Sequence, residues 1–395
     1  MAGWSSIKGN ELVESMGMRE IASTLRPGAY YFSGNEGVAE GAIAAGCRYY
    51  AGYPITPSSE IMEHISVRFH EVGGVFMQME DEIASICSVI GAVWAGAKAM
   101  TATSGPGFSL MQEAIGYAAF TETPLVVVDI QRAGPSSGQA TRVASGDLMQ
   151  AKWGSHGDYQ VIALCPWSVQ EMYDQTAAAF NLAEQFRVPV FLMGEETVGH
   201  LRERIEVGAT LTIYDRIKQP GAAPFGTEGD DGVPPMPSFG EGERLLVTGS
   251  SHNEFGIRKT DDPVAQANLV KRINKKILEN REEIIQTESY YLDDAEAVIV
   301  SYGFTARGSL FAVNQLREEG KRVGLLRLKT IWPFADRICQ EVGSRAKAIF
   351  VPEMNSGQIS GEIRKYVTCD VVAYSQTDGE VIHPNRIIEK VRSLL

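Results

Sequence analysis

Three acidic residues in the N-terminal third of the chain could take part in proton transfer. Glu80, Asp81 and Glu82 precede an apolar run whose small residues recur at helical spacing, so we expect them in the first turn of a helix. The helix dipole favours negative charge in that turn, and from the residues alone a purely electrostatic role is the ordinary interpretation. A carboxyl group held in an apolar pocket would instead keep its proton more tightly and could exchange it near neutral pH.

A threonine upstream lies in a stiff turn. The segment Tyr53-Pro54-Ile55-Thr56-Pro57 follows a predicted strand over 48–52, and its two prolines restrict the backbone on either side of Ile55 and Thr56. Ser58 or Ser59 is expected to cap the helix that follows. Thr56 is therefore predicted at a strand-to-helix turn, where α/β proteins place ligands.

An arginine follows a third predicted element. Residues 124–130 form an apolar run typical of a parallel strand buried on both faces, and Arg132 stands at its carboxyl end. A guanidinium group can bind a carboxylate through two parallel hydrogen bonds. A surface ion pair is the alternative role for Arg132.

The elements that must position these residues alternate along the chain, which predicts an α/β fold. Residues 99–103 fit a strand, 104–107 a sharp turn, and 167–187 a helix with a capping box from Ser168 to Glu171. Residues 219–240 are rich in Gly and Pro and are expected to be an exposed connection. Asp262 and Pro263 should open a helix that runs to about residue 286, with Arg272 and Lys276 on a solvated face. Further strands are expected at 188–193, 297–301, 322–326, 348–352 and 370–373.

Composition narrows the class of protein. The 395 residues are 44% hydrophobic and 22% charged, as in an ordinary globular protein, and the formal net charge of -13 leaves no basic footprint for nucleic acid. No apolar run is long enough for a membrane span, and no secretory leader is evident, so a cytoplasmic protein is expected. The five cysteines include no C-x-x-C pair, so this chain is a poor holder of an iron–sulfur cluster. Cys47 and Cys87 are expected in the core.

Four motifs together give a family resemblance. They are GNEGVAEGAIAAGC at 34–47, YPITPSSE at 53–60, EDEIAS at 80–85 and TSGPGFSLMQE at 103–113. The chain resembles, over essentially its whole length, the alpha subunits of the 2-oxoacid:ferredoxin oxidoreductases. That resemblance implies a thiamine diphosphate-binding fold with a parallel sheet and flanking helices, followed by a transketolase C-terminal-like α/β domain. The implied divisions are an N-terminal extension (1–28), a pyrimidine-binding domain (29–205), a linker and helical connection (206–292) and the C-terminal domain (293–395).

The resemblance also implies roles for individual residues. Glu82 is in register with the family glutamate that contacts N1′ of the cofactor and promotes loss of its C2 proton, while Glu80 and Asp81 compete for that role and are expected to face solvent or the helix end. Thr56 and Arg132 are implied to contact the head of the 2-oxoacid substrate. The remaining residues implied in cofactor binding are Tyr53, Pro54, Ile55, Ser104 and Gly105.

A loop after Arg132 completes the set of expected site residues. Residues 133–141, AGPSSGQAT, resemble a G-P-S-T-G-x-P-T loop of the multi-subunit family members and depart from it at Ser137 and Ala140. Ser136, Ser137 and His156, the last in an H-G-D element, are expected to line the site. For His156 an ordinary loop position is an equal alternative.

A missing motif implies partner subunits. Thiamine enzymes hold Mg²⁺ and the diphosphate with a G-D-G stretch, and this chain contains none. The resemblance therefore implies a beta subunit that carries this half-site and a [4Fe-4S] cluster, with separate gamma and small ferredoxin-like delta subunits as further candidates. Coenzyme A is the implied co-substrate and ferredoxin the electron acceptor.

The substrate implied by the loop and the chain length is 2-oxoglutarate. Branched-chain 2-oxoacids and pyruvate remain alternatives, because enzymes for these substrates share most of the motifs. Two other classes also remain open: a catalytically idle scaffold paralogue, and a transketolase or synthase that works without redox chemistry.

Overall fold

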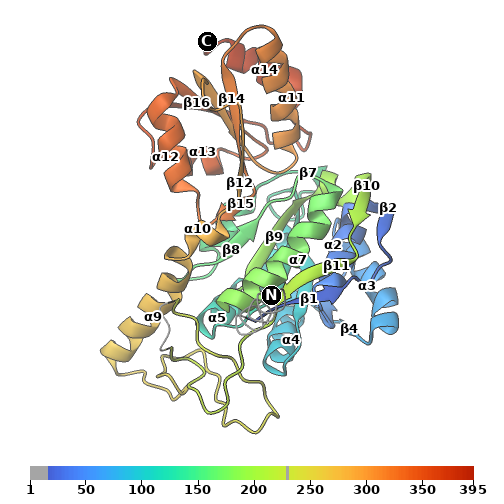
Figure 1. Ribbon diagram of the computed structural model, residues 1–395, viewed down its shortest axis with the longest axis vertical. Helices are drawn as coiled ribbons and strands as arrows, with labels where there is room; N and C mark the ends of the chain where they lie inside the picture. The colour runs from blue at the N-terminus through green and yellow to red at the C-terminus, as the bar shows by residue number, and fades with distance from the viewer. Residues whose placement is uncertain (1–16, 228–230) are drawn as a thin grey trace, which may run out of the picture.

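The computed structural model describes residues 17–227 and 231–395, which form two α/β domains (Figure 1). The expected N-terminal extension therefore lies mostly outside the described residues. Its described part contains β1 (Met18–Ala22), which pairs antiparallel with β11 (Thr210–Tyr214). A second two-stranded sheet joins β2 (Gly28–Ser33) to β10 (Arg202–Val207).

The larger domain is built on an eight-stranded sheet with the order β15-β8-β9-β6-β5-β3-β4, in which β7 pairs with β6 off this path. The six strands β8, β9, β6, β5, β3 and β4, neighbours in this order, are all parallel to one another. Strand β15 pairs antiparallel with β8, and β7 pairs antiparallel with β6. Strands β5 and β9 are buried at every residue and β6 at every residue except Arg132, as the apolar runs predicted. The bounds are β3 (Tyr49–Gly52), β4 (Val75–Gln78), β5 (Ala99–Thr103), β6 (Val126–Ala133), β7 (Gln139–Val143), β8 (Ile162–Leu164), β9 (Val190–Glu195) and β15 (Thr330–Trp332).

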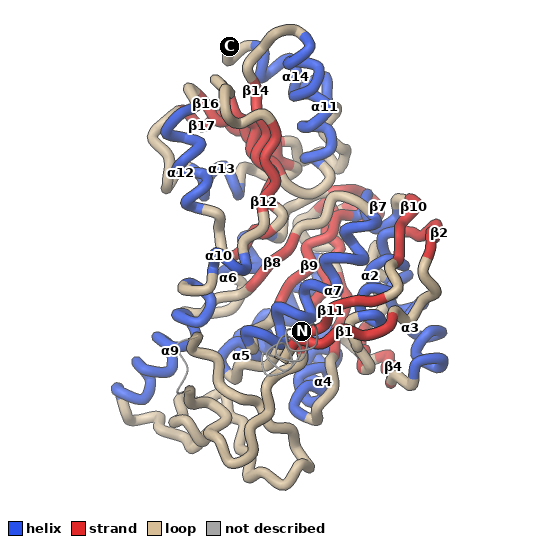
Figure 2. Tube along the Cα trace, viewed as in Figure 1, coloured by secondary structure: helices blue, strands red, loops and turns tan. Residues whose placement is uncertain are grey.

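Helices cover both faces of this sheet, with the strands red between blue helices in Figure 2. Successive residues of β6 point to opposite faces, so Val128 packs in one hydrophobic cluster and Val127 in another. The cluster with Val128 includes α2 (Gly34–Ala44), α3 (Ser59–Val72) and α7 (Val169–Phe186). The cluster with Val127 includes α4 (Glu82–Trp94), α5 (Gly105–Phe120) and α6 (Leu148–Trp153).

Helix α4 begins at Glu82, so of the three acidic residues expected in its first turn, Glu80, Asp81 and Glu82, only Glu82 lies within the helix. Asp81 is its N-cap, and its carboxylate accepts a hydrogen bond of 2.7 Å from the Ala84 amide. Glu80 precedes the helix. Cys47 is buried as predicted, but the core position predicted for Cys87 is wrong, because α4 turns this residue to its exposed side.

Two other helix predictions need correction. Ser168 caps α7 by accepting from the Glu171 amide, but the Glu171 carboxylate accepts from the Trp167 amide and not from Ser168, so only half of the capping box forms. Asp262 caps α9 (Pro263–Leu278) as predicted. The helix does not continue to residue 286, because the chain turns before α10 (Arg281–Ile284).

The smaller domain carries a five-stranded sheet with the order β12-β14-β13-β16-β17, parallel except for β12. Figure 1 shows it above the larger domain, with helices on both sides of the sheet. Its strands are β12 (Thr287–Tyr290), β13 (Ala297–Ser301), β14 (Val323–Leu328), β16 (Ala348–Glu353) and β17 (Asp370–Ser375). Its helices are α11 (Thr305–Glu318), α12 (Asp336–Arg345), α13 (Gln358–Ile363) and α14 (Pro384–Arg392).

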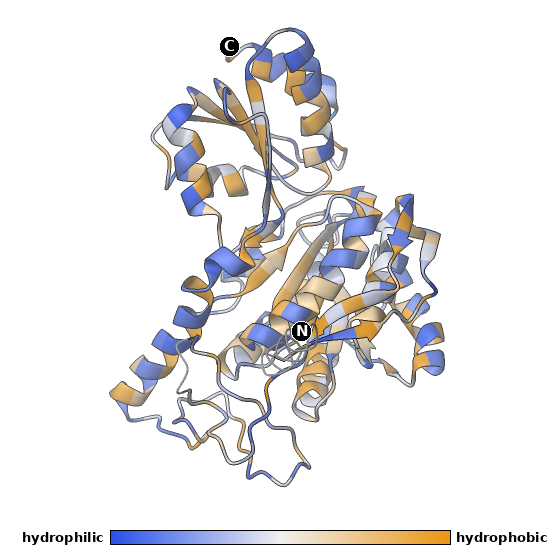
Figure 3. Cartoon of the chain, in the orientation of Figure 1, coloured by the Kyte–Doolittle hydropathy of each residue, from blue (hydrophilic) through white to orange (hydrophobic). Residues whose placement is uncertain are grey.

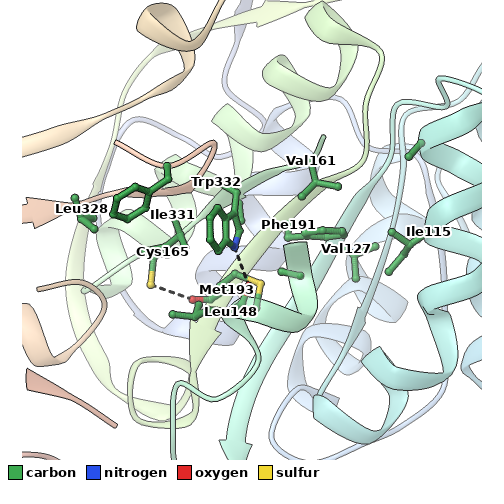
Figure 4. Packing of buried hydrophobic residues seen from close by; sticks show 14 of the residues in the cluster. Ile115, Val127, Leu148, Val161, Cys165, Phe191, Met193, Leu328, Ile331 and Trp332 are labelled. Atoms are coloured by element: carbon green, nitrogen blue, oxygen red, sulfur yellow. Dashed lines mark hydrogen bonds between the residues drawn. The ribbon is translucent and has the colours of Figure 1, made fainter. Parts of the chain in front are cut away.

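A shared hydrophobic core joins the two domains (Figure 4). Trp332 on β15 donates a hydrogen bond of 2.8 Å from its indole nitrogen to the Leu148 carbonyl, and Phe191 of the large sheet belongs to the same cluster. Because β15 follows β14 in the chain yet pairs with β8 of the large sheet, the smaller domain is tied to the larger one by backbone pairing as well as by packing.

The connection over 219–240 has no helix or strand in its described part, and residues 228–230 lie outside the described residues. The sequence predicts an exposed connection, but two of its apolar residues, Phe225 and Met236, are buried. Arg187 accounts for this, because its buried guanidinium donates to the carbonyls of Pro224 (2.6 Å) and Pro235 (3.0 Å). Figure 3 shows hydrophobic residues scattered along this lower region among polar ones. No helix in the described part of the chain has the length and apolar character of a bilayer span.

Candidate active site at the carboxyl edge of the large sheet

Glu82 is a buried carboxyl group at the start of α4. Its side chain is 5% exposed, and burial raises its pKa above the usual value, with a smaller contribution from the negative charge of Asp81. A Cβ atom at Gly107 would overlap both Glu82 Oε1 and Thr103 Oγ1. The glycine of the S-G-P-G turn therefore lets the carboxyl group lie against the first turn of α5.

The competing acidic residues have different surroundings. Glu80 is exposed, and Asp81 is engaged in capping α4 through its carboxylate. Glu82 alone among the three is buried, and the upward shift of its pKa makes this carboxyl group hold its proton more tightly than an exposed one.

The N-terminus of α5 lies next to this carboxyl group. Ser104 precedes the helix and is fully buried, and its hydroxyl has no hydrogen-bond partner among the described residues. Gly105 opens the helix, and a Cβ atom there would lie 3.2 Å from Asp147 Oδ2. Helix α5 has 16 residues, and the N-terminus of such a helix favours a negatively charged or electron-rich group in front of it.

Thr56 and Arg132, which the sequence placed on separate elements, are in direct contact. Arg132 Nη1 donates a hydrogen bond of 2.6 Å to the Thr56 carbonyl oxygen. Arg132 Nε has no partner, and within the described residues the guanidinium forms no ion pair with a carboxylate. The guanidinium therefore keeps donors free at the end of β6, in contrast to the surface ion pair considered as the alternative.

The turn that holds Thr56 differs in one detail from the expectation. Ser58 is the N-cap residue of α3 by position. Its hydroxyl, however, donates a hydrogen bond of 2.9 Å to the Ile55 carbonyl and does not cap the helix. The Thr56–Pro57 peptide is cis. Tyr53 is 41% exposed and Pro54 is exposed, so these two residues lie on the surface beside the turn.

The predicted lining residues lie farther out. Ser136 and Ser137 form the exposed tip of the hairpin between β6 and β7, just beyond Arg132. His156 has a side chain 85% exposed and lies 3.6 Å from Glu113 of α5. Glu113 is eight residues beyond Gly105, or about 12 Å along the helix at 1.5 Å per residue, so the structure does not bring His156 to Glu82.

The structure adds polar residues that the sequence analysis did not name as site residues. Thr103 lies opposite Asp129 in the β5–β6 pairing, and the Asp129 carboxyl group is within hydrogen-bonding reach of the Asp147 carboxyl group. Burial and the neighbouring Asp147 raise the pKa of Asp129 well above its usual value. Asp129 could have been suspected as a carboxylate within an otherwise apolar buried run, whereas no local pattern pairs it with Asp147.

Comparison with known protein families gives two matches. Residues 40–272 match the family described as pyruvate flavodoxin/ferredoxin oxidoreductase, thiamine diphosphate-binding. Residues 295–387 match pyruvate:ferredoxin oxidoreductase core domain II.

Curated relatives align over nearly their whole length. The chain is 47% identical over 368 residues to 2-oxoglutarate synthase subunit KorA of Methanothermobacter thermautotrophicus, covering 92% of this chain and 98% of the relative. It is 50% identical over 362 residues to subunit KorA of Methanocaldococcus jannaschii, covering 90% and 97%. Ketoisovalerate oxidoreductase subunit VorB of Methanothermobacter thermautotrophicus is 38% identical, with coverage of 91% and 96%.

Solved structures show the same relationship. A 2-oxoglutarate:ferredoxin oxidoreductase from Magnetococcus marinus, with 2-oxoglutarate, coenzyme A and succinyl-CoA bound, superimposes with a TM-score of 0.86 at 30% identity. The match covers 92% of this chain and 65% of that longer chain. A split-gene transketolase at 12% identity and a TM-score of 0.53 shares the fold. The family matches, the curated relatives and the buried glutamate beside the S-G-P-G turn together show that this chain belongs to the pyruvate flavodoxin/ferredoxin oxidoreductase family.

Proposed function

We propose that this chain is the alpha subunit of a thiamine diphosphate-dependent 2-oxoacid:ferredoxin oxidoreductase that acts on 2-oxoglutarate. In this reaction 2-oxoglutarate and coenzyme A give succinyl-CoA and CO₂, and the electrons released reduce ferredoxin. The observation that carries the proposal is the buried carboxyl group of Glu82, with its raised pKa, against the glycine turn of a thiamine diphosphate-binding family domain.

The residues present fit the aminopyrimidine half of the cofactor. Thiamine diphosphate supplies, when bound, a nucleophilic carbon for attack on the carbonyl of the 2-oxoacid. Glu82 would hold or release a proton at the N1′ atom, and Ser104 and Gly105 would face the ring from the α5 terminus. The pocket around Glu82 supports this role because burial raises the pKa of the carboxyl group, so that it holds a proton more readily than an exposed glutamate.

Arg132 and Thr56 would bind the carboxylate of the 2-oxoacid. Arg132 is already oriented by its hydrogen bond to the Thr56 carbonyl, and its remaining N–H groups can donate to a carboxylate. Tyr53, Pro54 and Ile55 would contact the cofactor, and Ser136 and Ser137 would line the entrance from the hairpin tip. The side chain of His156 is exposed, so it would take part in the site only if a partner subunit covered it.

Partner subunits would supply the other half of the machinery. We assign Mg²⁺ and the diphosphate to a beta subunit with a [4Fe-4S] cluster, because this sequence has no G-D-G stretch. Gamma and delta subunits would complete the electron path to ferredoxin. The relatives named as subunits support an assembly of several chains.

Two sets of relatives bear on the substrate. The relatives named 2-oxoglutarate synthase are 47% and 50% identical to this chain, whereas the ketoisovalerate oxidoreductase subunit is 38% identical. The larger identity favours 2-oxoglutarate, and a branched-chain 2-oxoacid is the second candidate.

The Glu82→Gln substitution in the assembled complex tests the proposal. Glutamine keeps the shape of the side chain but cannot exchange a proton, so we expect C2 proton exchange of bound thiamine diphosphate and turnover to fall by ~10²–10⁴-fold. Proton exchange can be followed by NMR in deuterated buffer. Glu80→Gln is the matched control, since Glu80 is exposed and one residue outside the helix cap. Normal exchange in Glu82→Gln would contradict the assignment.

A further inference from the structure

One buried amide ties the Thr56 turn to a different helix. Asn35 is the second residue of α2, and its side chain is fully buried. Its Nδ2 atom donates to the Pro57 carbonyl (2.8 Å) and to Glu60 Oε2 (2.9 Å). The amide therefore links the start of α2 to the turn and to the first residues of α3.

The start of α2 is itself fixed. Ser33 and Glu36 form a complete capping box, with the Glu36 amide donating to the Ser33 hydroxyl and the Glu36 carboxylate accepting from the Ser33 amide. A Cβ atom at Gly34 would overlap the Val198 carbonyl of α8 (Glu196–His200), and one at Gly199 would lie 3.0 Å from Asn35 Oδ1. Two glycines thus allow close packing that leaves the Asn35 amide little freedom.

Two consecutive carbonyl groups of the turn accept from side chains on other elements. The Thr56 carbonyl accepts from Arg132 of β6, and the Pro57 carbonyl accepts from Asn35 of α2. Movement of either peptide unit would shift the other, because the two meet at the Cα atom of Pro57, whose ring also restricts rotation about its N–Cα bond. The position of the Arg132 guanidinium at the strand end thus depends on a turn whose next carbonyl is held by Asn35.

We propose that Asn35 is a positioning residue for substrate binding, which holds the Thr56–Pro57 turn so that Thr56 and Arg132 present their groups to the carboxylate of the 2-oxoacid. This inference rests on the substrate-binding role proposed above for Thr56 and Arg132. Because both donors of the fully buried Asn35 amide are directed at Pro57 and Glu60, Asn35 would act through the backbone of the turn and not by touching the substrate.

The site requires a donor at position 35. Both groups in front of Nδ2 are acceptors, a carbonyl oxygen and the Glu60 carboxylate, and Glu60 also lies 3.4 Å from His200. An aspartate at position 35 has the same shape but would present an acceptor to both of them. Loss of a buried hydrogen bond together with an unsatisfied carbonyl is expected to displace the turn.

The first experiment measures steady-state kinetics of Asn35→Asp in the assembled complex. We expect KM for 2-oxoglutarate to rise on the order of tenfold, while kcat changes by less than about twofold, as one hydrogen bond and its unsatisfied partner predict. Glu60→Gln is the matched control, because its amide oxygen still accepts from Asn35 and the Pro57 contact is kept. Asn35→Ala, which adds no charge, gives the same readout if the aspartate variant fails to assemble.

A double variant separates positioning from a merely structural role. If Asn35 acts through the turn that Arg132 shares, Asn35→Asp combined with Arg132→Lys loses less kcat/KM than the product of the two single losses, whereas independent roles give multiplied losses. If Arg132→Lys lowers kcat/KM but neither Asn35 variant changes KM, the positioning role of Asn35 is wrong and the proposed function still stands. Unchanged kinetics in Arg132→Lys would overturn the substrate role and this inference together.

Discussion

Arg132 has the free donors that recognition of a small carboxylate needs. One N–H group is used on the Thr56 carbonyl, and the planar arrangement of the others is fixed by the guanidinium itself. Lysine at this position would keep the charge and lose the fork. If Arg132 binds the 2-oxoacid as proposed, this one contact would be a large part of the binding of so small a substrate.

Arg132→Lys is therefore expected to lower kcat/KM by about 10–100-fold, since a charge-assisted hydrogen bond is worth roughly 1.5–3 kcal/mol. If Arg132 binds the group common to all 2-oxoacids, the loss should be similar for 2-oxoglutarate, pyruvate and 2-oxoisovalerate. Steady-state assays of the assembled complex with the three substrates provide the measurement. A loss confined to 2-oxoglutarate would place Arg132 at the distal carboxylate, and no loss with any substrate would exclude a substrate contact.

Glu82, Thr56 and Arg132 each lie within a short motif at the end of a predictable element, but only the family resemblance implied their roles in the site, and those roles stay predictions. The contact between the Arg132 guanidinium and the Thr56 carbonyl, and the approach of Asp147 to Asp129, could not be predicted in the same way. They join residues on separate elements, and their geometry depends on sheet order and loop packing.

At the scale of elements, α9 is held to the large domain by a buried ionic cluster. Glu122, between α5 and β6, is fully buried and accepts from Arg272 Nη2 (2.6 Å) and Lys276 Nζ (2.6 Å). Burial alone would raise the pKa of Glu122, but the charges of Lys276 and Arg272 hold it well below its usual value. Desolvation lowers the pKa of Lys276 to about 8.

The solvated face expected for α9 is therefore wrong for Arg272 and Lys276. The cap at Asp262 and Pro263 was visible in the sequence because it is local. The partner of the two cations was not, because Glu122 lies about 150 residues away and has no helical register with them.

Glu122→Gln should destabilise the protein by about 3–5 kcal/mol, because it leaves Lys276 and Arg272 buried without a carboxylate. Denaturant unfolding, followed by circular dichroism, would measure the loss. Glu279→Gln is the matched control, since Glu279 forms a half-exposed pair with Lys275 at 3.3 Å and should change stability by less than about 1 kcal/mol. Equal effects of the two substitutions would show that the buried cluster contributes no more than a surface pair.

At the scale of the whole molecule, the sequence motifs predicted two α/β units, but not how they join. Strand β15 leaves the smaller domain and pairs with β8, and Trp332 reaches the Leu148 carbonyl across the joint. A three-residue strand that adds to a distant sheet has no periodic pattern of its own. Its placement is decided by long-range packing.

A buried carboxyl group lies at the same joint. Glu195, at the end of β9, accepts from the Phe304 amide of the smaller domain at 2.7 Å, and a Cβ atom at Gly303 would lie 2.6 Å from its other oxygen. Burial raises the pKa of Glu195 to about 8. Between its ordinary value of 4.5 and this value, the folded protein binds a proton at Glu195 that the unfolded chain has released.

The free energy of unfolding should therefore fall as pH rises from about 4.5 to about 8, by at most about 1.4 kcal/mol per pH unit from this group. Glu195→Gln keeps an acceptor for the Phe304 amide but cannot ionise, so its stability relative to wild type should increase steadily across that interval. Denaturant unfolding of both proteins at each pH gives the difference and cancels the titrations that they share. A difference that does not vary between pH 5 and pH 8 would show that Glu195 is already ionised in the folded protein, and that the joint between the domains holds a buried negative charge.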